Sequence, residues 1–220
     1  MEQLLPTDNR LDPDEALRAL SERRGRPWVF ASAAMTLNGK INCKHRPLGG
    51  PGDQVWYGLL HQFAETVVIG GENFRTASTD QGTRYQGKEL VILSNSLDLP
   101  LHAPAFSGGT KVKIFTRSQE TLDVDNDTVE YFRSDSWTPE GIVKALGQRR
   151  ILIDGGGDIY RFFFPVVMDW IVCSVPLFAG ESQPGIWTGQ DESALLDLRW
   201  LYSADNRLFC RWSNTALLSP

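Results

Sequence analysis

The sequence is poor in cysteine and histidine. Its three cysteines are widely spaced and include no Cys-x-x-Cys pair: Cys43, Cys173 and Cys210. An odd number without such a pair indicates neither a disulfide framework nor a zinc site, so we expect three free thiols and no metal. None of the three histidines stands in a His-x-Glu motif. The zinc chemistry of nucleobase deaminases is therefore excluded.

The chain also lacks a surplus of positive charge and any long apolar run. Its 22 Lys and Arg against 27 Asp and Glu give a formal net charge of -5. Binding to nucleic acid needs concentrated positive charge, so a small anionic ligand suits this chain better than a polyanion. No apolar run reaches the roughly 18 residues of a membrane span, and the polar start of the chain is unlike a signal peptide. We therefore expect a soluble, cytoplasmic protein with neither a nucleic-acid nor a membrane partner.

Three consecutive glycines are the most distinctive feature that is present. The apolar run from Ile151 to Ile153 suits a strand buried on both faces, and it ends at Gly155, Gly156 and Gly157. From Ile159 the apolar residues fall at helical spacing. Glycines between a strand and a helix allow positive φ and let an anion approach bare amides at the positive end of the helix. The pattern predicts a phosphate site or, alternatively, a tight turn where the helix packs closely on the sheet.

The remaining segments predict an α/β fold with a mixed, mostly parallel central sheet and helices on both faces. The expected strands are 28–35, 66–69, 90–93, 112–115, 129–132, 151–153 and 170–175, and segments 196–202 and 208–212 are expected to form a C-terminal antiparallel hairpin. Helices are expected from an Asp53 N-cap to Phe63 and from Thr138 to Gly147. Residues 1–26 suit an N-terminal helical appendage, and residues 27–220 suit a single domain.

Polar side chains follow the ends of several predicted strands, where ligands bind in open α/β sheets. The first strand runs into Asn38-Gly39, a turn signal, and its loop contains Lys40, Lys44 and Arg46. These cations suit either a phosphate or a solvated loop. The ends at Ser94-Asn95-Ser96 and Arg117 offer hydroxyl, amide and guanidinium groups for a 2′-phosphorylated adenosine ribose. The same residue types also form turns for purely local reasons.

Together these segments resemble the RibD C-terminal family, the reductase domain of riboflavin biosynthesis, which has the dihydrofolate-reductase-like fold. Thr36 to Ile41 is similar to the family's Ser-Leu-Asp-Gly-Arg/Lys-Ile segment, and Ile153 to Gly157 to its Glu-Gly-Gly-Gly. Val67 to Arg75 resembles its second strand and following turn, and Leu93 to Pro100 its adenosine-side loop. The similarity extends from about residue 27 to residue 212.

The resemblance implies NADPH as hydride donor, a homodimer, and 5-amino-6-(5-phosphoribosylamino)uracil as the substrate that is reduced to its ribitylamino product. The implied cofactor-binding residues are Thr36, Gly70, Gly71, Ser94, Asn95, Ser96, Asp154, Gly155, Gly156 and Gly157. We assign catalysis to Asn38, which could hydrogen-bond the substrate, and to Lys40, which could stabilise negative charge or deliver a proton. The candidates for binding the substrate's phosphate are Lys44, Arg46, Arg75 and Arg84.

Two segments depart from the family's pattern on the substrate side. Asn38 stands where the family has Asp, and Ala77-Ser78-Thr79 stands where it has Asp-Asp-Pro. Two alternatives therefore stay open: a reductase of the same fold acting on a pterin, dihydrofolate or another heterocycle, and a non-catalytic NADPH-binding protein. Asp53 is a further candidate acid, although its position favours helix capping. Cys43 has no base beside it apart from His45, and we interpret it as a bystander.

Overall fold

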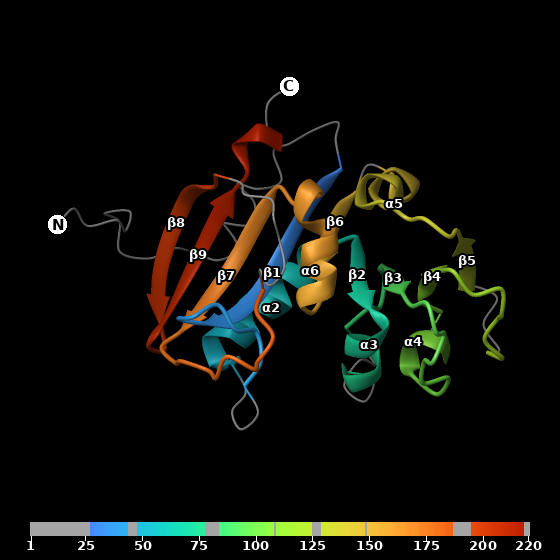
Figure 1. Cartoon of the computed structure of the whole chain (residues 1–220), viewed down its shortest axis with the longest axis horizontal. Helices are drawn as coiled ribbons and strands as arrows, with labels where there is room; N and C mark the ends of the chain where they lie inside the picture. The colour runs from blue at the N-terminus through green and yellow to red at the C-terminus, as the bar shows by residue number, and fades with distance from the viewer. Residues whose placement is uncertain are drawn as a thin grey trace.

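The computed structural model describes residues 27–43, 48–77, 84–107, 109–124, 129–147, 149–186 and 195–217. Their strands form one nine-stranded sheet in the order β5-β4-β3-β2-β6-β1-β7-β9-β8 (Figure 1). The strands are β1 (Trp28–Thr36), β2 (Thr66–Gly70), β3 (Glu89–Leu93), β4 (Lys111–Thr116), β5 (Val129–Arg133), β6 (Arg150–Ile153), β7 (Asp169–Val175), β8 (Asp197–Ala204) and β9 (Arg207–Ser213). All pairs from β5 to β7 are parallel, and the pairs β7–β9 and β9–β8 are antiparallel. The expected mostly parallel sheet and C-terminal hairpin are confirmed.

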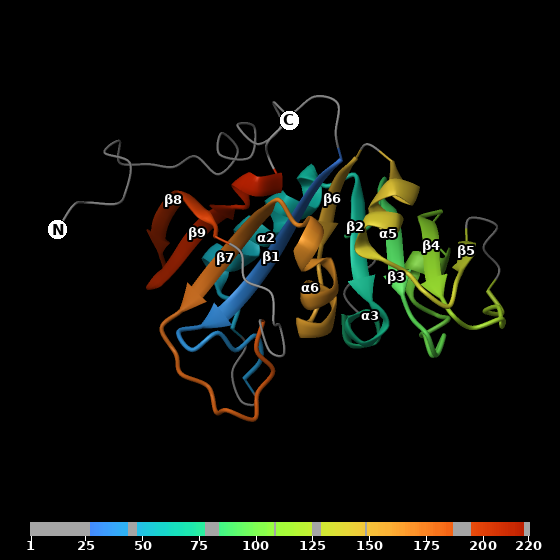
Figure 2. The same ribbon diagram turned by 45° about the horizontal axis from the view of Figure 1, so that its top comes forward.

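Helices cover both faces of this sheet. On one face, α2 (Pro51–Phe63), α3 (Gly71–Ala77) and α4 (Pro104–Ser107) contribute Leu60, Phe74 and Phe106 to one core cluster. On the other, α5 (Pro139–Leu146) and α6 (Gly157–Phe163) contribute Ile142 and Phe163 to a second cluster. Figure 2 shows α5 and α6 in front of the sheet and α2 behind it. Two short 3-10 turns, η1 (Phe164–Val166) and η2 (Thr215–Leu217), complete the described elements.

The central strands are apolar on both sides because each side faces a helical layer. In β6, Leu152 joins the cluster beneath α2, whereas Ile151 and Ile153 join the cluster beneath α6. All three are fully buried. The continuous apolar run at the start of the glycine motif is thereby explained, because side chains alternate between faces along a strand.

Helix α5 shows how the sequence sets its own boundaries. The Thr138 side chain caps the helix by accepting from Gly141 N at 3.1 Å, and Pro139 occupies the first helical turn. Gly147 ends the helix with a φ of 77°. The sequence predicted this helix from Thr138-Pro139-Glu140 at its start and from Gly147 at its end, and the structure confirms both boundaries.

One expectation from the sequence was wrong, and two helices were missed. Helix α2 begins at Pro51 with Gly50 as its N-cap, so Asp53 lies inside the first turn and does not cap it. The sequence allowed positive φ at Gly155 to Gly157, but the described glycines with positive φ are Gly39, Gly87, Gly109 and Gly147. Helices α3 and α4 were not expected. The predicted appendage, residues 1–26, lies outside the described residues.

Two loops meet beyond the carboxyl ends of the strands, residues 37–43 after β1 and 176–186 after β7 (Figure 1). Ile41 N donates to Pro184 O at 3.0 Å, and Ile186 N donates to Gly39 O at 3.0 Å. The expected turn at Asn38-Gly39 is confirmed, since Gly39 has a φ of 73° and its N–H donates to Thr36 O at 2.9 Å. The two loops therefore form one hydrogen-bonded wall at this end of the sheet.

A buried carboxylate joins three strands at the opposite, amino end. Asp169 begins β7 and is 0% exposed. Its Oδ2 accepts from Trp28 Nε1 at 2.7 Å, and its Oδ1 accepts from Arg211 Nε at 2.8 Å and from the Ser213 hydroxyl. This joint connects β1, β7 and β9.

Candidate active site

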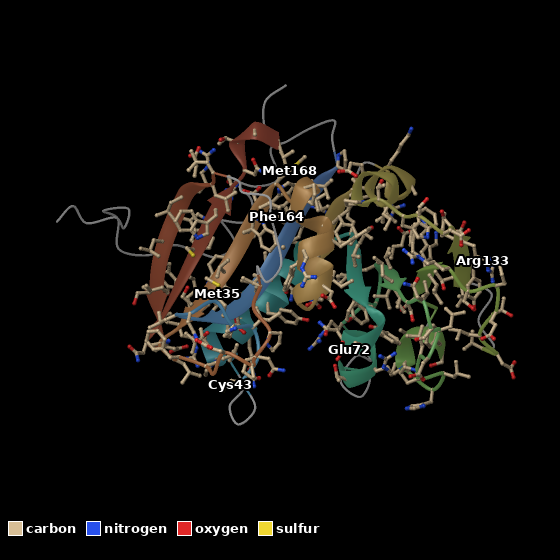
Figure 3. All side chains as sticks on the ribbon, in the orientation of Figure 1. Met35, Cys43, Glu72, Arg133, Phe164 and Met168 are labelled. Carbon is tan, nitrogen blue, oxygen red and sulfur yellow. The ribbon has the colours of Figure 1, made fainter. Side chains whose placement is uncertain are left out.

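A cavity of about 1090 Å³ opens along the carboxyl ends of β1, β2, β3, β4 and β6. In Figure 3, Glu72 and Cys43 lie at this end of the molecule and Met168 lies at the other. Ser94, Asn95 and Arg117 line the part beside β3 and β4, which we call the β3–β4 arm. The part beside β1 and the start of α2, the β1 arm, is lined by Ser32, Ala33, Lys40, Asp53, Tyr57 and Asp154. The glycines that follow β2 and β6 lie between the two arms.

These glycines are needed for close packing to different degrees. A Cβ on Gly155 would lie 2.5 Å from Cβ of Ile159, and a Cβ on Gly157 would lie 2.9 Å from the backbone oxygen of Gly185. On Gly156 the nearest atom would be Oδ1 of Asn73 at 3.4 Å, an ordinary contact. Gly155 and Gly157 are therefore required by the fold, whereas Gly156 presents a bare backbone to the cavity without a packing reason.

Eight of the predicted cofactor-binding residues line the cavity: Gly70, Gly71, Ser94, Asn95, Asp154, Gly155, Gly156 and Gly157. Thr36 and Ser96 do not line it. The Thr36 side chain is buried and donates to Asn38 Oδ1 at 2.7 Å, and the Ser96 hydroxyl accepts from Asp98 N at 3.4 Å. The structure thus brings the glycines and the β3 end together around one space.

The two predicted catalytic residues have different positions. Asn38 is exposed and does not line the cavity; its Nδ2 donates to Ala179 O at 2.7 Å and its Oδ1 accepts from Ala179 N at 3.1 Å. These bonds attach the turn after β1 to the loop after β7. Lys40 does line the cavity, and its Nζ donates to Glu181 O at 2.9 Å. Lys40 is therefore the better placed of the two to meet a ligand.

Two predicted phosphate-binding residues can be placed. Arg75, on α3, donates to Asp98 O at 2.8 Å and does not line the cavity. Arg84 donates from Nη1 to the Tyr57 hydroxyl at 3.3 Å, and its guanidinium lies 5.0 Å from the centre of that ring. Lys44 and Arg46 lie outside the described residues. Arg84 thus reaches the β1 arm through Tyr57.

Asp154 is held in a network that sequence reasoning did not find. Its Oδ2 accepts from the Tyr57 hydroxyl at 2.6 Å and from His61 Nε2 at 3.2 Å. Burial opposes ionisation of Asp154, but the hydrogen bonds from His61 and Tyr57 and the charge of Arg84 outweigh it and lower the pKa of Asp154. Burial and the Asp154 carboxylate together raise the pKa of Tyr57, which stays a phenol and a donor.

The network could not be predicted because its members are far apart in sequence. Tyr57 and His61 are one helical turn apart on α2, a spacing that places both on one face. Asp154, however, follows β6, 93 residues after His61. The sequence therefore contained a signal for the pair Tyr57 and His61, but none for Asp154 as their acceptor.

Asp53 has surroundings that favour its protonated form. It lines the cavity from the first turn of α2, and its carboxyl is hydrogen-bonded to the Cys173 thiol with Arg207 nearby. Burial raises the pKa of Asp53 in spite of those two neighbours. Burial and the Asp53 charge raise the pKa of Cys173 to about 12, so this thiol is a donor and not a nucleophile. The expectation that Cys43, Cys173 and Cys210 are free is confirmed.

Among the described residues, no group of His, Cys, Asp and Glu side chains is arranged to hold a metal ion. Within the same part of the chain, no helix combines the length and the apolar character needed to cross a membrane.

The family model described as the RibD C-terminal domain matches residues 27–209. A pyrimidine reductase-like protein from Corynebacterium diphtheriae has a TM-score of 0.73 at 18% identity, over 92% of this chain and 98% of that one. A riboflavin biosynthesis reductase from Saccharomyces cerevisiae has a TM-score of 0.66 at 13% identity, over 89% and 94%. None of the curated proteins matches the sequence.

A Thermotoga maritima protein described as a diaminohydroxyphosphoribosylaminopyrimidine deaminase and 5-amino-6-(5-phosphoribosylamino)uracil reductase has a TM-score of 0.68 at 17% identity. The match covers 86% of this chain but only 57% of that protein. These similarities confirm the expected dihydrofolate-reductase-like fold.

Proposed function

The chain belongs to the RibD C-terminal domain family, a family of riboflavin-biosynthesis reductases, and we propose that it is an NADPH-dependent pyrimidine reductase. Its proposed substrate is 5-amino-6-(5-phosphoribosylamino)uracil, which is reduced to the ribitylamino product. The observation that carries the proposal is the continuity of the cavity: one space of about 1090 Å³ connects the polar β3–β4 arm, the glycine turns and the acidic β1 arm. This arrangement suits a long dinucleotide with its reactive ring beside ionisable groups.

The residues that line the cavity fit NADPH. Gly156 offers bare backbone that no packing contact requires, which suits close approach of a diphosphate. Ser94, Asn95 and Arg117 offer hydroxyl, amide and guanidinium groups for the adenosine ribose and its phosphate. When bound, the dihydronicotinamide supplies the hydride. The protein then has to orient the substrate and manage one proton.

In the β1 arm, different residues suit different parts of binding the substrate and stabilising its charge. The ionised Asp154, fixed by Tyr57 and His61, suits a fixed acceptor for substrate hydroxyls. Lys40 carries a positive charge into the cavity and could stabilise negative charge on the substrate. Asn38 is proposed to act on the substrate only through the loop that it holds at Ala179.

A second candidate is a reductase of another heterocycle, such as a pterin. The placement of Asn38 favours it, since both amide atoms are engaged with Ala179 and the side chain does not line the cavity. A substrate contact from this position, expected from the family's Asp, is therefore replaced by a contact within the protein.

We also propose that the chain is cytoplasmic and forms a homodimer. Half-buried Leu198, Leu201 and Trp212 on β8 and β9 could form the contact between two copies.

The proposal is tested by coenzyme binding followed by turnover. NADPH at a hundredfold excess over its Kd should raise the free energy of unfolding of the purified chain by about 2.7 kcal/mol. The Tm should rise accordingly. An Arg117→Ala variant should bind NADPH more weakly, by about tenfold or more, with little change for NADH, because NADH lacks the phosphate that the guanidinium would meet. Arg199→Ala, on the edge strand β8 and outside the cavity, is the matched control.

Turnover separates the candidates. NADPH oxidation with the ribosylamino pyrimidine and not with dihydrofolate supports the first proposal, and the reverse preference supports the second. Coenzyme binding with no turnover of either compound would identify a non-catalytic NADPH-binding protein. A chain whose Tm is unchanged by NADPH would contradict all three.

A further inference from the structure

The β1 arm contains two carboxyl groups with unlike surroundings. Asp154 receives two strong donors, a phenol at 2.6 Å and an imidazole at 3.2 Å. Asp53 is hydrogen-bonded to the Cys173 thiol, which is a weak donor. Asp53, Asp154 and Tyr160 all line the cavity, and the pKa of the Tyr160 phenol is raised first by burial and then by the charges of Asp154 and Asp53. The two acids therefore face one region of the cavity.

The position of Asp53 is fixed by backbone that closes over it. A Cβ on Gly49 would lie 2.8 Å from Asp53 Oδ2, and a Cβ on Gly50 would lie 2.5 Å from the Arg207 guanidinium carbon. Helix α2 does not need Asp53 as its cap, because Gly50 occupies that position. The first turn of α2 favours a carboxylate through the helix dipole, but the dipole does not require a half-buried carboxyl that Gly49 closes over and that lines the cavity.

We propose that Asp53 is the general acid of this site and contacts the substrate directly, an inference that rests on the reductase proposed above. The reduction adds one hydride and one proton to the substrate. The O–H bond of the Asp53 carboxyl breaks, and its proton forms a new O–H bond with the sugar ring oxygen while the bond from that oxygen to the anomeric carbon breaks. The electron pair of the amino nitrogen closes a C=N bond, which then accepts the hydride at carbon and is reduced to an amine. Solvent returns the proton to Asp53.

The opposite pKa directions of the two acids agree with this division of labour. Burial raises the pKa of Asp53, so its protonated form persists to higher pH than that of an ordinary carboxyl, whereas Asp154 is held ionised. Two carboxyls whose environments separate their pKa values in this way are typical of an acid and its charged partner. Asp154 is therefore the acceptor and Asp53 the donor.

The charged and titratable groups around Asp53 are few among the described residues. Cys173 faces it from β7, Arg207 from β9 and Tyr160 from α6, and the Asp205 carboxylate binds Gly52 N at 2.8 Å one residue away. Burial raises the pKa of Cys173 to about 12 and raises that of Tyr160, so neither loses its proton near neutral pH. A fall in activity with rising pH that disappears in Asp53→Asn should therefore report on Asp53.

The test compares Asp53→Asn with Asp205→Asn in the full-length chain. Asp53→Asn should lower kcat for the ribosylamino pyrimidine by about 10²–10⁴-fold, the usual contribution of a general acid. It should also abolish the fall in kcat with rising pH, while leaving the Kd for NADPH within about twofold of the unsubstituted chain. Asp205→Asn keeps an acceptor for Gly52 N outside the cavity and should retain full activity.

Two measurements without turnover complete the test. Carboxyl ¹³C NMR of the free chain should give Asp53 a pKa above the ordinary value of about 3.9. A raised pKa in the folded state means that charged Asp53 lowers stability at pH 7, so Asp53→Asn should not lower the Tm there. A purely structural carboxyl would give a lower Tm.

The outcomes are distinguishable. Retained kcat and an unchanged pH profile in Asp53→Asn, an Asp53 pKa at or below about 3.9, or equal losses in both variants would each overturn the inference while leaving the reductase proposal intact. Coenzyme binding without turnover in the unsubstituted chain would overturn the reductase and the acid together.

Discussion

At the scale of single residues, the site depends on how the protein holds a negative charge inside its core. Asp154 follows a buried strand, and its side chain is 15% exposed. It stays ionised because Tyr57 and His61 donate to the same oxygen and Arg84 lies beyond Tyr57. An ionised group in such a position stabilises the fold only while its donors are present.

Replacing Asp154 by Asn should destabilise the chain at pH 7 by about 1.5–3 kcal/mol, the range for hydrogen bonds to a charged group. The amide keeps the size of the side chain but removes the charge that Tyr57 and His61 face. Urea unfolding followed by circular dichroism measures the loss. Asp98→Asn, at a carboxyl that is 80% exposed, should be close to neutral.

The loss should also depend on pH. A carboxyl whose pKa is lower in the folded chain than the unfolded value of about 3.9 binds fewer protons when folded. Its stabilisation is complete above that value and disappears as pH falls through the folded-state pKa. The difference between the unsubstituted chain and Asp154→Asn should therefore shrink below about pH 3.9. A deficit that is the same at pH 7 and in acid would show that the charge has no part in it.

At the scale of elements, the turn between β6 and α6 serves packing and ligand approach with different glycines. Gly155→Ala should destabilise the chain by about 1–3 kcal/mol, because the new methyl would meet Ile159 Cβ at 2.5 Å. Gly156→Ala should leave the Tm almost unchanged, since its φ of -90° suits alanine and its nearest neighbour would be 3.4 Å away. Thermal unfolding distinguishes the two.

Gly156→Ala, the variant with the smaller effect on stability, should have the larger effect on NADPH binding. A methyl on Gly156 projects beside Asn73 into the cavity, where the proposed diphosphate lies, so the Kd of Gly156→Ala should rise about tenfold or more although the fold is intact. If Gly156→Ala bound NADPH as tightly as the unsubstituted chain, the turn between β6 and α6 would serve only the packing of the fold and not coenzyme binding.

The same elements show how far the sequence could predict the structure. Strand β6 and the hairpin turn at Asp205-Asn206, with φ of 50° and 57°, follow from local signals, an apolar run and turn-forming residues. Helix α3 was missed because it begins directly where β2 ends, at Gly71, without a loop. The Asp53 cap was wrong because Gly50 and Pro51 already start α2.

The residues that line the site were largely predicted, but the contacts between their side chains were not. Glycines and strand ends carry local signals, so Gly70, Gly71 and Gly155 to Gly157 were found and do line the cavity. Side-chain partners depend on which strands are neighbours. Asp154 meets α2, and Asn38 meets Ala179, across 93 to 141 residues of sequence. No local pattern contains such pairs.

At the scale of the whole molecule, the two ends of the sheet have separate tasks. The cavity lies at the carboxyl ends of the parallel strands, and the Asp169 joint lies at the amino ends of β1 and β7. Figure 3 shows the separation, with Met168 at one end and Glu72 and Cys43 at the other. Substitutions at the joint should therefore change stability without changing ligand binding.

Asp169→Ala tests this separation. Removing the carboxylate leaves Arg211, whose side chain is only 11% exposed, without its partner and also removes the acceptor of Trp28 and Ser213. Breaking a buried pair from one side costs about 3–5 kcal/mol, and urea unfolding followed by far-ultraviolet circular dichroism should show a loss of that size. Asp197→Ala is the matched control. Its contact with Arg199 is 3.7 Å long and half exposed, so the change should stay below about 1 kcal/mol.

Both variants should bind NADPH with unchanged Kd at temperatures where they remain folded, because neither position lines the cavity. Weaker binding by folded Asp169→Ala would mean that the joint sets the positions of β1 and β7 at their far ends. A loss of stability no larger than that of the control would mean that Trp28, Arg211 and Ser213 find other partners. Either result would contradict the assignment of stability to one end of the sheet and chemistry to the other.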